Sequence, residues 1–588
     1  MDNECLSVSV PVGETQIQYQ KYLAAVQQGY LSESALDASL IRLFAARLKL
    51  GLLDPPELDP WSHIDEKELG SPEHRALARE IANESMVLLK NDGTLPLKPG
   101  IRNIAVVGPL ADQTDVLLGN YAGRPTHTVS MMEGLKAAFP GAHITYVPGT
   151  QFLLSDGQPV PDNLLTTADG QPGLKANYYE WTGTSFRPDS IGAALASRNE
   201  PNIHLTRANL PTEVAAKKSV CVQWTGLLHP PEFGLYMIGI RASGTAVLSV
   251  AGNQIASTSG SGGYHVGFGA IQLDKGEPAA LSVRLGFGGG SEPAVQLLWA
   301  KVTDEPSAEA IAAARKADVV IAAVGITSHL EGEQSGIDLP GFLGGDRTSI
   351  DLPGPEEVLV EGMVATGKPV VVVLMNGSAL AVNWINDHAN AVLESWYSGE
   401  EGGNAIADTL SGKNNPAGRL PVTFYKSVVQ LPNFEDYSMQ NRTYRYFTGK
   451  PLYPFGYGLS YTTFGYSNLK LPEGAIHAGD PLVATITLTN NGKVAGDEVA
   501  QLYLTFPNVA GSPLRALRAF QRVHLEPGAS QDVEFHLSPR DLSMVTEAGD
   551  IIVAQGKYTI AIGGGQPGTD APTKSGSFEV KGKIQLPE

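Results

Sequence analysis

Hydrophobic positions along the chain follow two periods, one typical of helices and one typical of strands. The segment 74–91 (HRALAREIANESMVLLKN) predicts a helix, and 101–112 (IRNIAVVGPLAD) predicts a buried strand followed by a loop. The segment 130–149 (SMMEGLKAAFPGAHITYVPG) predicts a helix and then a strand. This alternation is typical of an α/β domain with mainly parallel strands.

The same alternation returns after an interruption. Residues 307–325 predict a helix and a strand, 354–377 repeat that order, and 391–412 (AVLESWYSGEEGGNAIADTLSG) predict a strand, a loop and a helix. The uninterrupted apolar run Val370–Met375 suits a sheet that is covered on both faces.

Two stretches have only the strand period. Between about residues 173 and 302, short alternating runs such as 234–243 (GLYMIGIRAS) and 279–287 (AALSVRLGF) are separated by glycine-rich turns. This predicts an all-β domain inserted into the α/β domain. From about residue 466 the chain again shows short strands at the spacing of a β-sandwich.

Residues 15–50 predict two helices, the second capped by Ser32 or Ser34 and ended by Gly51 and Pro55. Its apolar positions form one stripe: Leu36, Leu40, Ile41, Leu43, Phe44 and Leu48. Two helices alone cannot bury such a stripe, so we expect the stripe to pack on a partner or to mediate association.

The charge balance bears on the class of partner. The chain has 61 acidic and 42 basic residues, a formal net charge of -19. This argues against nucleic acid as a partner, because binding phosphates requires clustered Lys and Arg. The two cysteines, Cys5 and Cys221, are too far apart in sequence for a local metal motif or a disulfide framework.

Targeting and membrane segments are not expected either. No apolar run approaches the ~18 residues of a membrane helix, so no membrane partner is predicted. The first residues, MDNECLSVSVPVG, have neither a basic region nor an apolar core, so they are not a signal peptide.

Candidate chemistry gathers after the predicted strands. Glu331 and Glu333 follow the strand that ends near residue 325, and Asp346 and Arg347 come shortly after them. Ligands favour loops at the carboxyl ends of strands in α/β sheets, although a glutamate pair on a loop is usually only a solvated surface.

Other polar clusters have two interpretations. Asn376–Ser378 and Trp396–Gly403 also follow predicted strands, but their glycines indicate turns. A further cluster could bind sugar hydroxyls or pack as a linker: Arg442, Tyr444, Arg445 and Tyr446. The nucleophile-elbow motif of hydrolases, the phosphate-binding loop motif and the zinc-protease motif are all absent from the sequence. No residue is assigned to substrate binding.

Several segments together resemble the glycoside hydrolase family 3 β-glycosidases. They include IAVVGPLAD (104–112), LEGEQ with GGDRTSIDLP (330–353), VVVVLMNGSAL (370–380), WYSGEEGGNAIADTLSGKNNPAGRLPVTF (396–424) and PLYPFGYGLSYTTF (451–464). The resemblance covers nearly the whole chain. It implies a multidomain α/β plus all-β fold, with an α/β sandwich interrupted by a PA14-like β-sandwich and followed by a fibronectin-III-like β-sandwich.

With this resemblance the predicted domains follow in order. They are 1–55, a remnant of the end of a (β/α)₈ barrel; 56–73, a linker; 74–167, the first part of the α/β sandwich; 168–303, the PA14-like insertion; 304–430, the second part of the α/β sandwich; 431–465, a linker; and 466–588, the fibronectin-III-like domain.

The resemblance also assigns roles. Family members use a nucleophile from the barrel and a general acid/base from the α/β sandwich. Glu331 matches the acid/base by its place before Gly-Asp-Arg, and Glu333 is the alternative because the inserted residues 335–344 blur the alignment. The nucleophile is expected upstream of Met1, so no residue of this chain is assigned to it. No cofactor and no metal are implied.

The function implied is that of a retaining exo-β-glycosidase, a β-glucosidase or β-xylosidase, that releases terminal non-reducing sugars from β-linked oligosaccharides or aryl glycosides. We expect this chain to be a fragment that is inactive alone. Two alternatives remain: a non-catalytic carbohydrate-binding protein, and one half of a split glycosidase. The family implies a periplasmic or secreted location.

Overall fold

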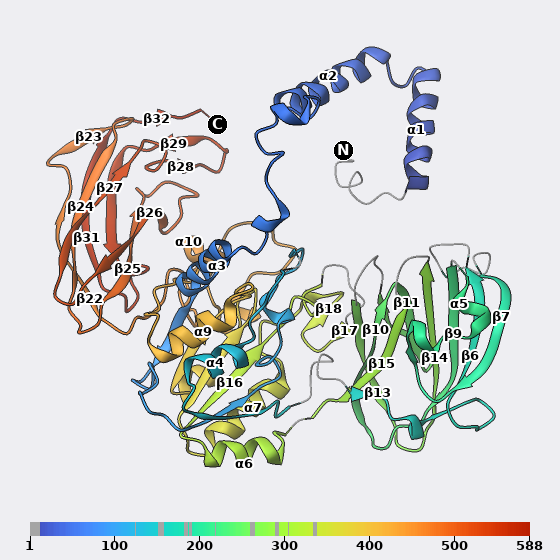
Figure 1. Cartoon of the computed structure of the whole chain (residues 1–588). Coiled ribbons are helices and arrows are strands. Elements are labelled where there is room, and N and C mark those ends of the chain that lie inside the picture. The colour runs from blue at the N-terminus through green and yellow to red at the C-terminus, as the bar shows by residue number, and fades with distance from the viewer. Residues whose placement is uncertain are drawn as a thin grey trace. The chain divides into compact units, whose positions relative to one another are not determined.

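The computed structural model describes residues 12–587, except 124, 151–157, 182–185, 187–190, 218, 259–264, 289–292, 304 and 333–337. It divides into two compact units, Met1–His74 and Arg75–Glu588 (Figure 1).

The first unit contains the two predicted helices, α1 (Val12–Gln27) and α2 (Glu33–Lys49). Ser32 caps α2, because its side chain accepts a hydrogen bond from the Ala35 amide. No residue of α2 is buried, and Leu48 is 59% exposed. None of the described helices is long and apolar enough to cross a membrane.

The second unit is built around a six-stranded sheet with the order β1-β21-β20-β16-β2-β3. All neighbouring strands are parallel except β1 and β21, which are antiparallel. The strands are β1 (Val87–Asn91), β2 (Asn103–Val107), β3 (His143–Val147), β16 (Val319–Gly325), β20 (Val370–Met375) and β21 (Ala391–Glu394). The strands β16, β20 and β21 are buried at every position, as expected for a sheet covered on both faces.

Helices cover this sheet. They are α3 (Pro72–Ser85), α4 (Met131–Ala138), α6 (Ala308–Lys316), α7 (Gly354–Val364), α8 (Asn383–His388) and α9 (Gly402–Ser411). Helix α7 packs on α6, β16 and β20, while α4 packs on α9. The α4–α9 contact needs glycine, because a Cβ on Gly134 would lie 2.1 Å from the carbonyl oxygen of Gly403.

The helix predicted over 74–91 is wrong in its last third. Helix α3 ends at Ser85, and Val87–Asn91 form β1, which pairs with β21. The side chains of Met86 and Leu88 are both fully buried. A surface helix exposes part of every turn, whereas a strand in a covered sheet buries an uninterrupted apolar run.

The predicted insertion is a two-sheet β-sandwich. One sheet has the order β12-β11-β14-β9-β6-β7, with β5 paired to β9, and the other has the order β13-β10-β15-β4, with β8 paired to β15. The elements are β4 (Gln158–Pro159), β5 (Leu165–Thr166), β6 (Leu174–Trp181), β7 (Ile191–Glu200), β8 (His204–Leu205), α5 (Thr212–Ala215), β9 (Ser219–Leu228), β10 (Gly234–Ser243), β11 (Thr245–Val250), β12 (Asn253–Thr258), β13 (His265–Leu273), β14 (Ala279–Gly288) and β15 (Ala294–Lys301).

The sandwich has its own hydrophobic core, which includes Trp224, Ile238 and Leu285. Met237 and Leu298, by contrast, belong to the core of the α/β sheet. The insertion therefore closes around its own core and packs one sheet against the α/β domain. Its strands β4 and β5 precede residue 168, so the sandwich includes residues upstream of the predicted boundary.

The C-terminal strands form a second all-β region, which confirms the coarse prediction of an α/β part followed by an all-β part. Its sheets have the orders β22-β24-β27, β23-β31-β30-β25-β26 and β28-β29-β32. The strands are β22 (Phe464–Lys470), β23 (Ala475–His477), β24 (Leu482–Asn490), β25 (Gly496–Thr505), β26 (Ala516–Leu525), β27 (Ser530–Leu537), β28 (Met544–Val545), β29 (Ile551–Val553), β30 (Gly556–Gly563), β31 (Thr573–Lys581) and β32 (Ile584–Gln585).

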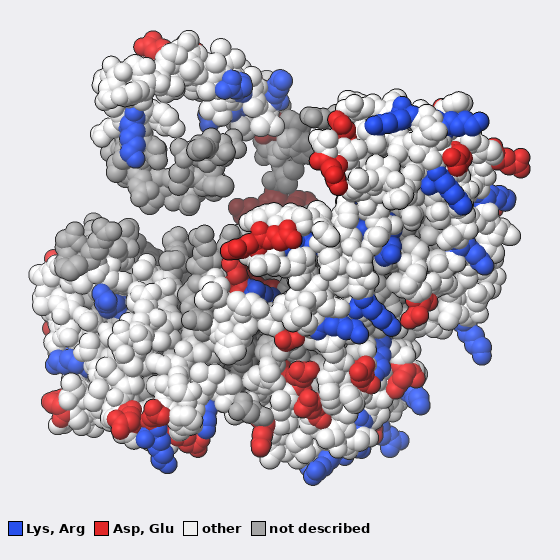
Figure 2. All heavy atoms as spheres, turned by 180° about the vertical axis from the view of Figure 1, so that it is seen from behind, with Lys and Arg blue, Asp and Glu red and all other residues white. Residues whose placement is uncertain are grey.

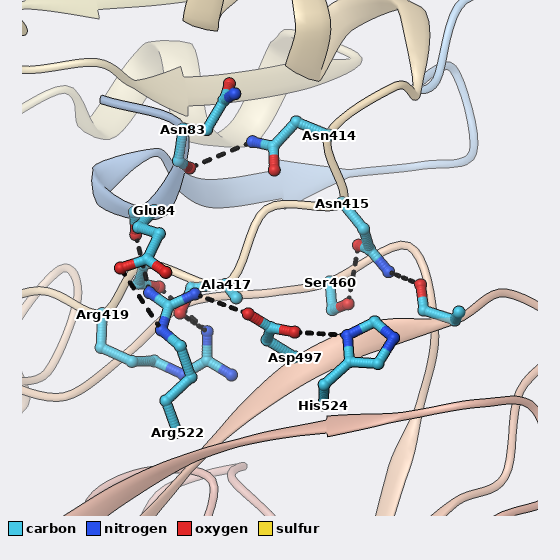
Figure 3. Close-up of polar contacts among 12 residues, drawn as sticks. Asn83, Glu84, Asn414, Asn415, Ala417, Arg419, Ser460, Asp497, Arg522 and His524 are labelled. Atoms are coloured by element: carbon cyan, nitrogen blue, oxygen red, sulfur yellow. Dashed lines mark hydrogen bonds and ion pairs between the residues drawn. The ribbon is translucent and has the colours of Figure 1, made fainter. Parts of the chain in front are cut away.

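Polar contacts join this region to the α/β domain (Figure 3). Arg522 on β26 donates to the Glu84 carbonyl at 3.0 Å and to the Asp497 carboxylate at 3.0 Å. Arg419 and Glu498 form an ion pair at 3.1 Å with both side chains largely buried. Removing one partner of such a buried ion pair lowers the free energy of unfolding more than removing one partner of an exposed pair does.

The surface charges are interspersed. On the face drawn in Figure 2, Lys and Arg side chains alternate with Asp and Glu, and the described residues there form no broad basic patch.

We predict that α2 exchanges its amide hydrogens much faster than β20. The reason is that α2 has no buried residue, whereas every residue of β20 is buried. Hydrogen exchange followed by mass spectrometry on the whole chain measures both. Equally strong protection in a monomeric sample would mean that α2 has a partner surface, contrary to this prediction.

We further predict that residues 158–303 fold when expressed alone, because they contain the sandwich core and both short strands that precede residue 168. Circular dichroism should show β structure and a cooperative thermal transition. Fragment 168–303 is the matched comparison and should melt at a lower temperature, since it lacks β4 and β5. An aggregated or unfolded 158–303 would count against an autonomous domain.

Candidate acid/base site

Three loops at the carboxyl ends of neighbouring strands form the candidate site. Glu331 follows β16, Ser378 follows β20 and Tyr397 follows β21. The register aligns Gly325 with Met375 on the adjacent strand. Because parallel strands in register end at the same edge of a sheet, the three loops meet there.

The Glu331 carboxylate accepts a hydrogen bond on each oxygen. The Ser378 hydroxyl donates to Oε1 at 2.5 Å, and the Tyr397 hydroxyl donates to Oε2 at 2.7 Å. The Asn120 side-chain amide donates to the backbone carbonyl of Glu331 at 2.8 Å. The side chain is half-buried, so the acid is held in place without being closed off from solvent.

Gly377 makes the approach of Tyr397 possible. A Cβ at position 377 would lie 2.6 Å from Cε2 of the Tyr397 ring and 3.4 Å from Oε2 of Glu331. Any larger residue there would push the tyrosine away from the carboxylate.

Arg347 supports the same loop from the hairpin β17 (Asp338–Leu339), β18 (Phe342–Leu343) and β19 (Asp346–Arg347). Its Nη1 donates to the Ser378 hydroxyl and to the Ala379 carbonyl, both at 3.0 Å. Burial lowers the pKa of the Arg347 guanidinium, and the negative charge of Glu331 opposes that shift. The Asp346 side chain is exposed.

Burial raises the pKa of the Tyr397 hydroxyl, and the Glu331 carboxylate raises it further. The hydroxyl therefore stays protonated and remains a hydrogen-bond donor to Glu331.

A second carboxyl, Glu394, lies behind these loops at the end of β21. It is fully buried, and burial raises its pKa to about 8 against two hydrogen bonds that lower it. Those bonds come from the Trp396 amide to Oε1 at 3.0 Å and from the Asn376 side chain to Oε2 at 3.1 Å.

The other predicted residues fall in different places. Glu333 lies outside the described residues. The aromatic and basic cluster packs in the linker that contains α10 (Thr443–Tyr446): the Tyr444 ring stacks on Phe455 with centroids 4.0 Å apart, and its hydroxyl accepts from the Leu517 amide. These contacts of Tyr444 are those of a packed side chain.

Sequence reasoning did not assign Ser378, Tyr397 or Glu394 to the site. The available signal was their position, since each lies at or just after the end of a predicted strand in a parallel sheet. Among the described residues, no group of three or more His, Cys, Asp and Glu side chains is arranged to hold a metal ion.

Comparison with known families places this geometry in context. The glycosyl hydrolase family 3 C-terminal domain matches residues 86–461, and a fibronectin type III-like domain matches residues 498–566. Glu331, Ser378, Tyr397 and Glu394 all fall within the first match.

Named relatives are similar along most of this chain. The xylan 1,4-beta-xylosidase of Xylanibacter ruminicola is 33% identical over 560 residues, covering 93% of this chain and 63% of that protein. A beta-glucosidase of Rhizobium radiobacter is 31% identical over 583 residues, covering 92% and 67% respectively. The periplasmic beta-glucosidase of Salmonella typhimurium is 29% identical over 590 residues, covering 96% and 58%.

A solved structure agrees with them. The β-glucosidase from Streptomyces venezuelae in complex with D-glucose has a TM-score of 0.70 and 25% identity, covering 95% of this chain and 66% of that one. The chain thus spans between 58% and 67% of the lengths of these four proteins. Because the domain match extends over more than half of its residues, the chain belongs to glycosyl hydrolase family 3.

Proposed function

We propose that this chain carries the general acid/base, Glu331, of a retaining exo-β-glycosidase that acts on β-glucosides or β-xylosides. The observation that carries the proposal is the pair of hydroxyl donors on the Glu331 carboxylate, at 2.5 and 2.7 Å, at the carboxyl edge of a parallel sheet. The names of the relatives, β-xylosidase and β-glucosidase, support the substrate class.

The chemistry uses one carboxyl twice. In a retaining glycosidase the acid first protonates the leaving oxygen, and the resulting carboxylate then removes a proton from water. Ser378 and Tyr397 donate to Glu331, so they stabilise the carboxylate that exists between the two steps. They also fix the orientation of both oxygens.

The nucleophile completes the reaction. Retaining enzymes place the two carboxyl groups about 5–5.5 Å apart. We propose that the nucleophile comes from a barrel domain of the family type that is not among these 588 residues, in the same polypeptide or in a second one. The shares of the relatives that this chain spans support that arrangement.

Two finer assignments accompany the proposal. The inserted sandwich is proposed to be a PA14-like domain, on the basis of its two antiparallel sheets and separate core. A periplasmic or secreted location is proposed from the name of the Salmonella typhimurium relative.

We predict the effect of replacing Glu331 with Gln in this chain joined to a family 3 barrel. The substitution should slow the hydrolysis of glycosides with poor leaving groups most. These substrates need the proton, and positioned acid/base catalysis contributes roughly 10²–10⁴-fold. For a 2,4-dinitrophenyl glycoside, whose leaving group needs no proton, the rate of the glycosylation step should fall much less. Measuring kcat/KM across aryl glycosides of graded leaving-group pKa tests this.

Glu333→Gln is the matched control for that series. If it reproduces the leaving-group dependence while Glu331→Gln keeps full rates, Glu333 is the acid/base and the assignment of Glu331 is wrong.

We also predict that the 588-residue chain alone hydrolyses β-glucosides and β-xylosides at a negligible rate, because Glu331 without a nucleophile cannot form the glycosyl-enzyme. Product release from aryl glycosides measures this directly. Turnover at ordinary enzyme rates would require a nucleophile within these residues. Binding of oligosaccharides by both the isolated and the joined protein, without turnover by either, would favour a carbohydrate-binding protein instead.

A further inference from the structure

Glu394 occupies an unusual position behind the candidate acid/base. It is the last residue of β21 and is fully buried, yet both carboxylate oxygens accept hydrogen bonds. A buried carboxyl is costly unless it is hydrogen-bonded in this way. Its two donors belong to two different loops, and each of those loops also carries a hydroxyl that donates to Glu331.

The first connection runs through the loop after β20. The Asn376 side-chain nitrogen donates to Glu394 Oε2 at 3.1 Å and to the Ser378 carbonyl at 2.9 Å. The Ser378 hydroxyl then donates to Glu331 Oε1 at 2.5 Å. Asn376 is itself fully buried, so no solvent contact competes for this amide.

The second connection runs through the loop after β21. The Trp396 amide donates to Glu394 Oε1 at 3.0 Å, and the next residue, Tyr397, donates to Glu331 Oε2 at 2.7 Å. Trp396 has φ of 60°, a left-handed conformation that is strained for a residue with a side chain. Such a conformation persists only where the surroundings hold it, and the bond to Glu394 is one of those restraints.

We propose that Glu394 is a positioning residue for the acid/base: its single carboxyl couples the two loops whose hydroxyls orient both oxygens of Glu331. The catalytic consequence rests on the proposed function of Glu331, whereas the coupling itself is a property of the described fold. Glu394 acts only through Ser378 and Tyr397 and does not touch the substrate.

The substitution Glu394→Gln separates the two connections. Above the pKa of Glu394, about 8, both of its oxygens only accept hydrogen bonds. There Gln keeps the size of the side chain and can still accept from the Trp396 amide, but its NH₂ faces the NH₂ of Asn376. If Asn376 turns its amide over to accept from that group, it can no longer donate to the Ser378 carbonyl. Either way one bond of the Glu394–Asn376–Ser378 connection is lost. Glu394→Leu removes both connections.

Hydrogen exchange on the 588-residue chain, at a pH above the Glu394 pKa of about 8, tests the coupling without any need for activity. Glu394→Gln should speed amide exchange in residues 376–380 at least several-fold and leave 396–400 nearly unchanged, whereas Glu394→Leu should speed exchange in both. Glu498→Gln is the matched control, because Glu498 is also a buried, hydrogen-bonded glutamate but contacts Arg419 and Tyr466. It should leave both loops unchanged. Unaltered exchange of 376–380 in Glu394→Gln would overturn the proposal.

Kinetics of the chain joined to a family 3 barrel test the catalytic consequence. Misplacing a catalytic group by about 1 Å costs on the order of 10²-fold. We therefore expect Glu394→Gln to lower kcat/KM about 10- to 100-fold for poor leaving groups and only slightly for 2,4-dinitrophenyl glycosides. Added to Glu331→Gln, it should cause little further loss, because the residue that it positions is already disabled.

If Glu394→Gln lowers kcat/KM equally for good and poor leaving groups, Glu394 is merely structural. The same conclusion follows if the two reductions in kcat/KM multiply in the double variant. If Glu331→Gln itself shows no leaving-group dependence, the proposed function fails. The exchange experiment still decides the coupling in that case.

Discussion

The candidate site depends on one constraint, the parallel register of three fully buried strands. Val324 and Gly325 of β16 pair with Leu374 and Met375 of β20, and β20 pairs in parallel with β21. Apart from Glu394 at the end of β21, these strands are apolar, so a slip of one residue would place apolar side chains against different helices and disturb the packing on both faces. The register is therefore held firmly, and it fixes where the three following loops begin.

Close approach of backbones sharpens that constraint. A Cβ on Gly325 would lie 2.0 Å from the Met375 carbonyl oxygen, and one on Gly377 would collide with the Tyr397 ring. Glycine at these positions lets neighbouring loops touch at the sheet edge. Hydrogen bonds about 2.5–2.7 Å long to Glu331 become possible only at this spacing.

Much of the fold follows from periodicity. Uninterrupted apolar runs such as Val370–Met375 predict covered parallel strands, and alternating runs predict the two all-β regions. The exception is instructive. Residues 87–91 continue the apolar pattern of α3 without a glycine or proline between them, so local pattern favours one long helix. Pairing with β21, a partner about 300 residues away, decides the outcome instead.

The site is only partly predictable. Glu331 is predictable because its segment resembles the acid/base segment of the family and because it follows a predicted strand. Ser378 and Tyr397 lie beside glycines, which indicate turns equally well, and nothing local reveals that their hydroxyls meet on one carboxylate. Glu394 is still less visible, because a glutamate that ends an apolar strand usually marks the point where the chain reaches solvent. Only the assembled sheet shows that its carboxyl is enclosed.

Enclosing Glu394 has a thermodynamic consequence with a definite sign. A glutamate in the unfolded chain loses its proton near pH 4.5, whereas burial raises the pKa of Glu394 in the folded state to about 8. Between these values the folded state binds more protons, so stability falls as the pH rises and levels off above the folded pKa. Each pKa unit corresponds to about 1.4 kcal/mol, so the loss is on the order of 5 kcal/mol.

As far as Glu394 is concerned, the folded state is therefore most stable on the acidic side of the folded pKa. A single buried carboxyl at the edge of the sheet thus makes the stability of the fold depend on pH.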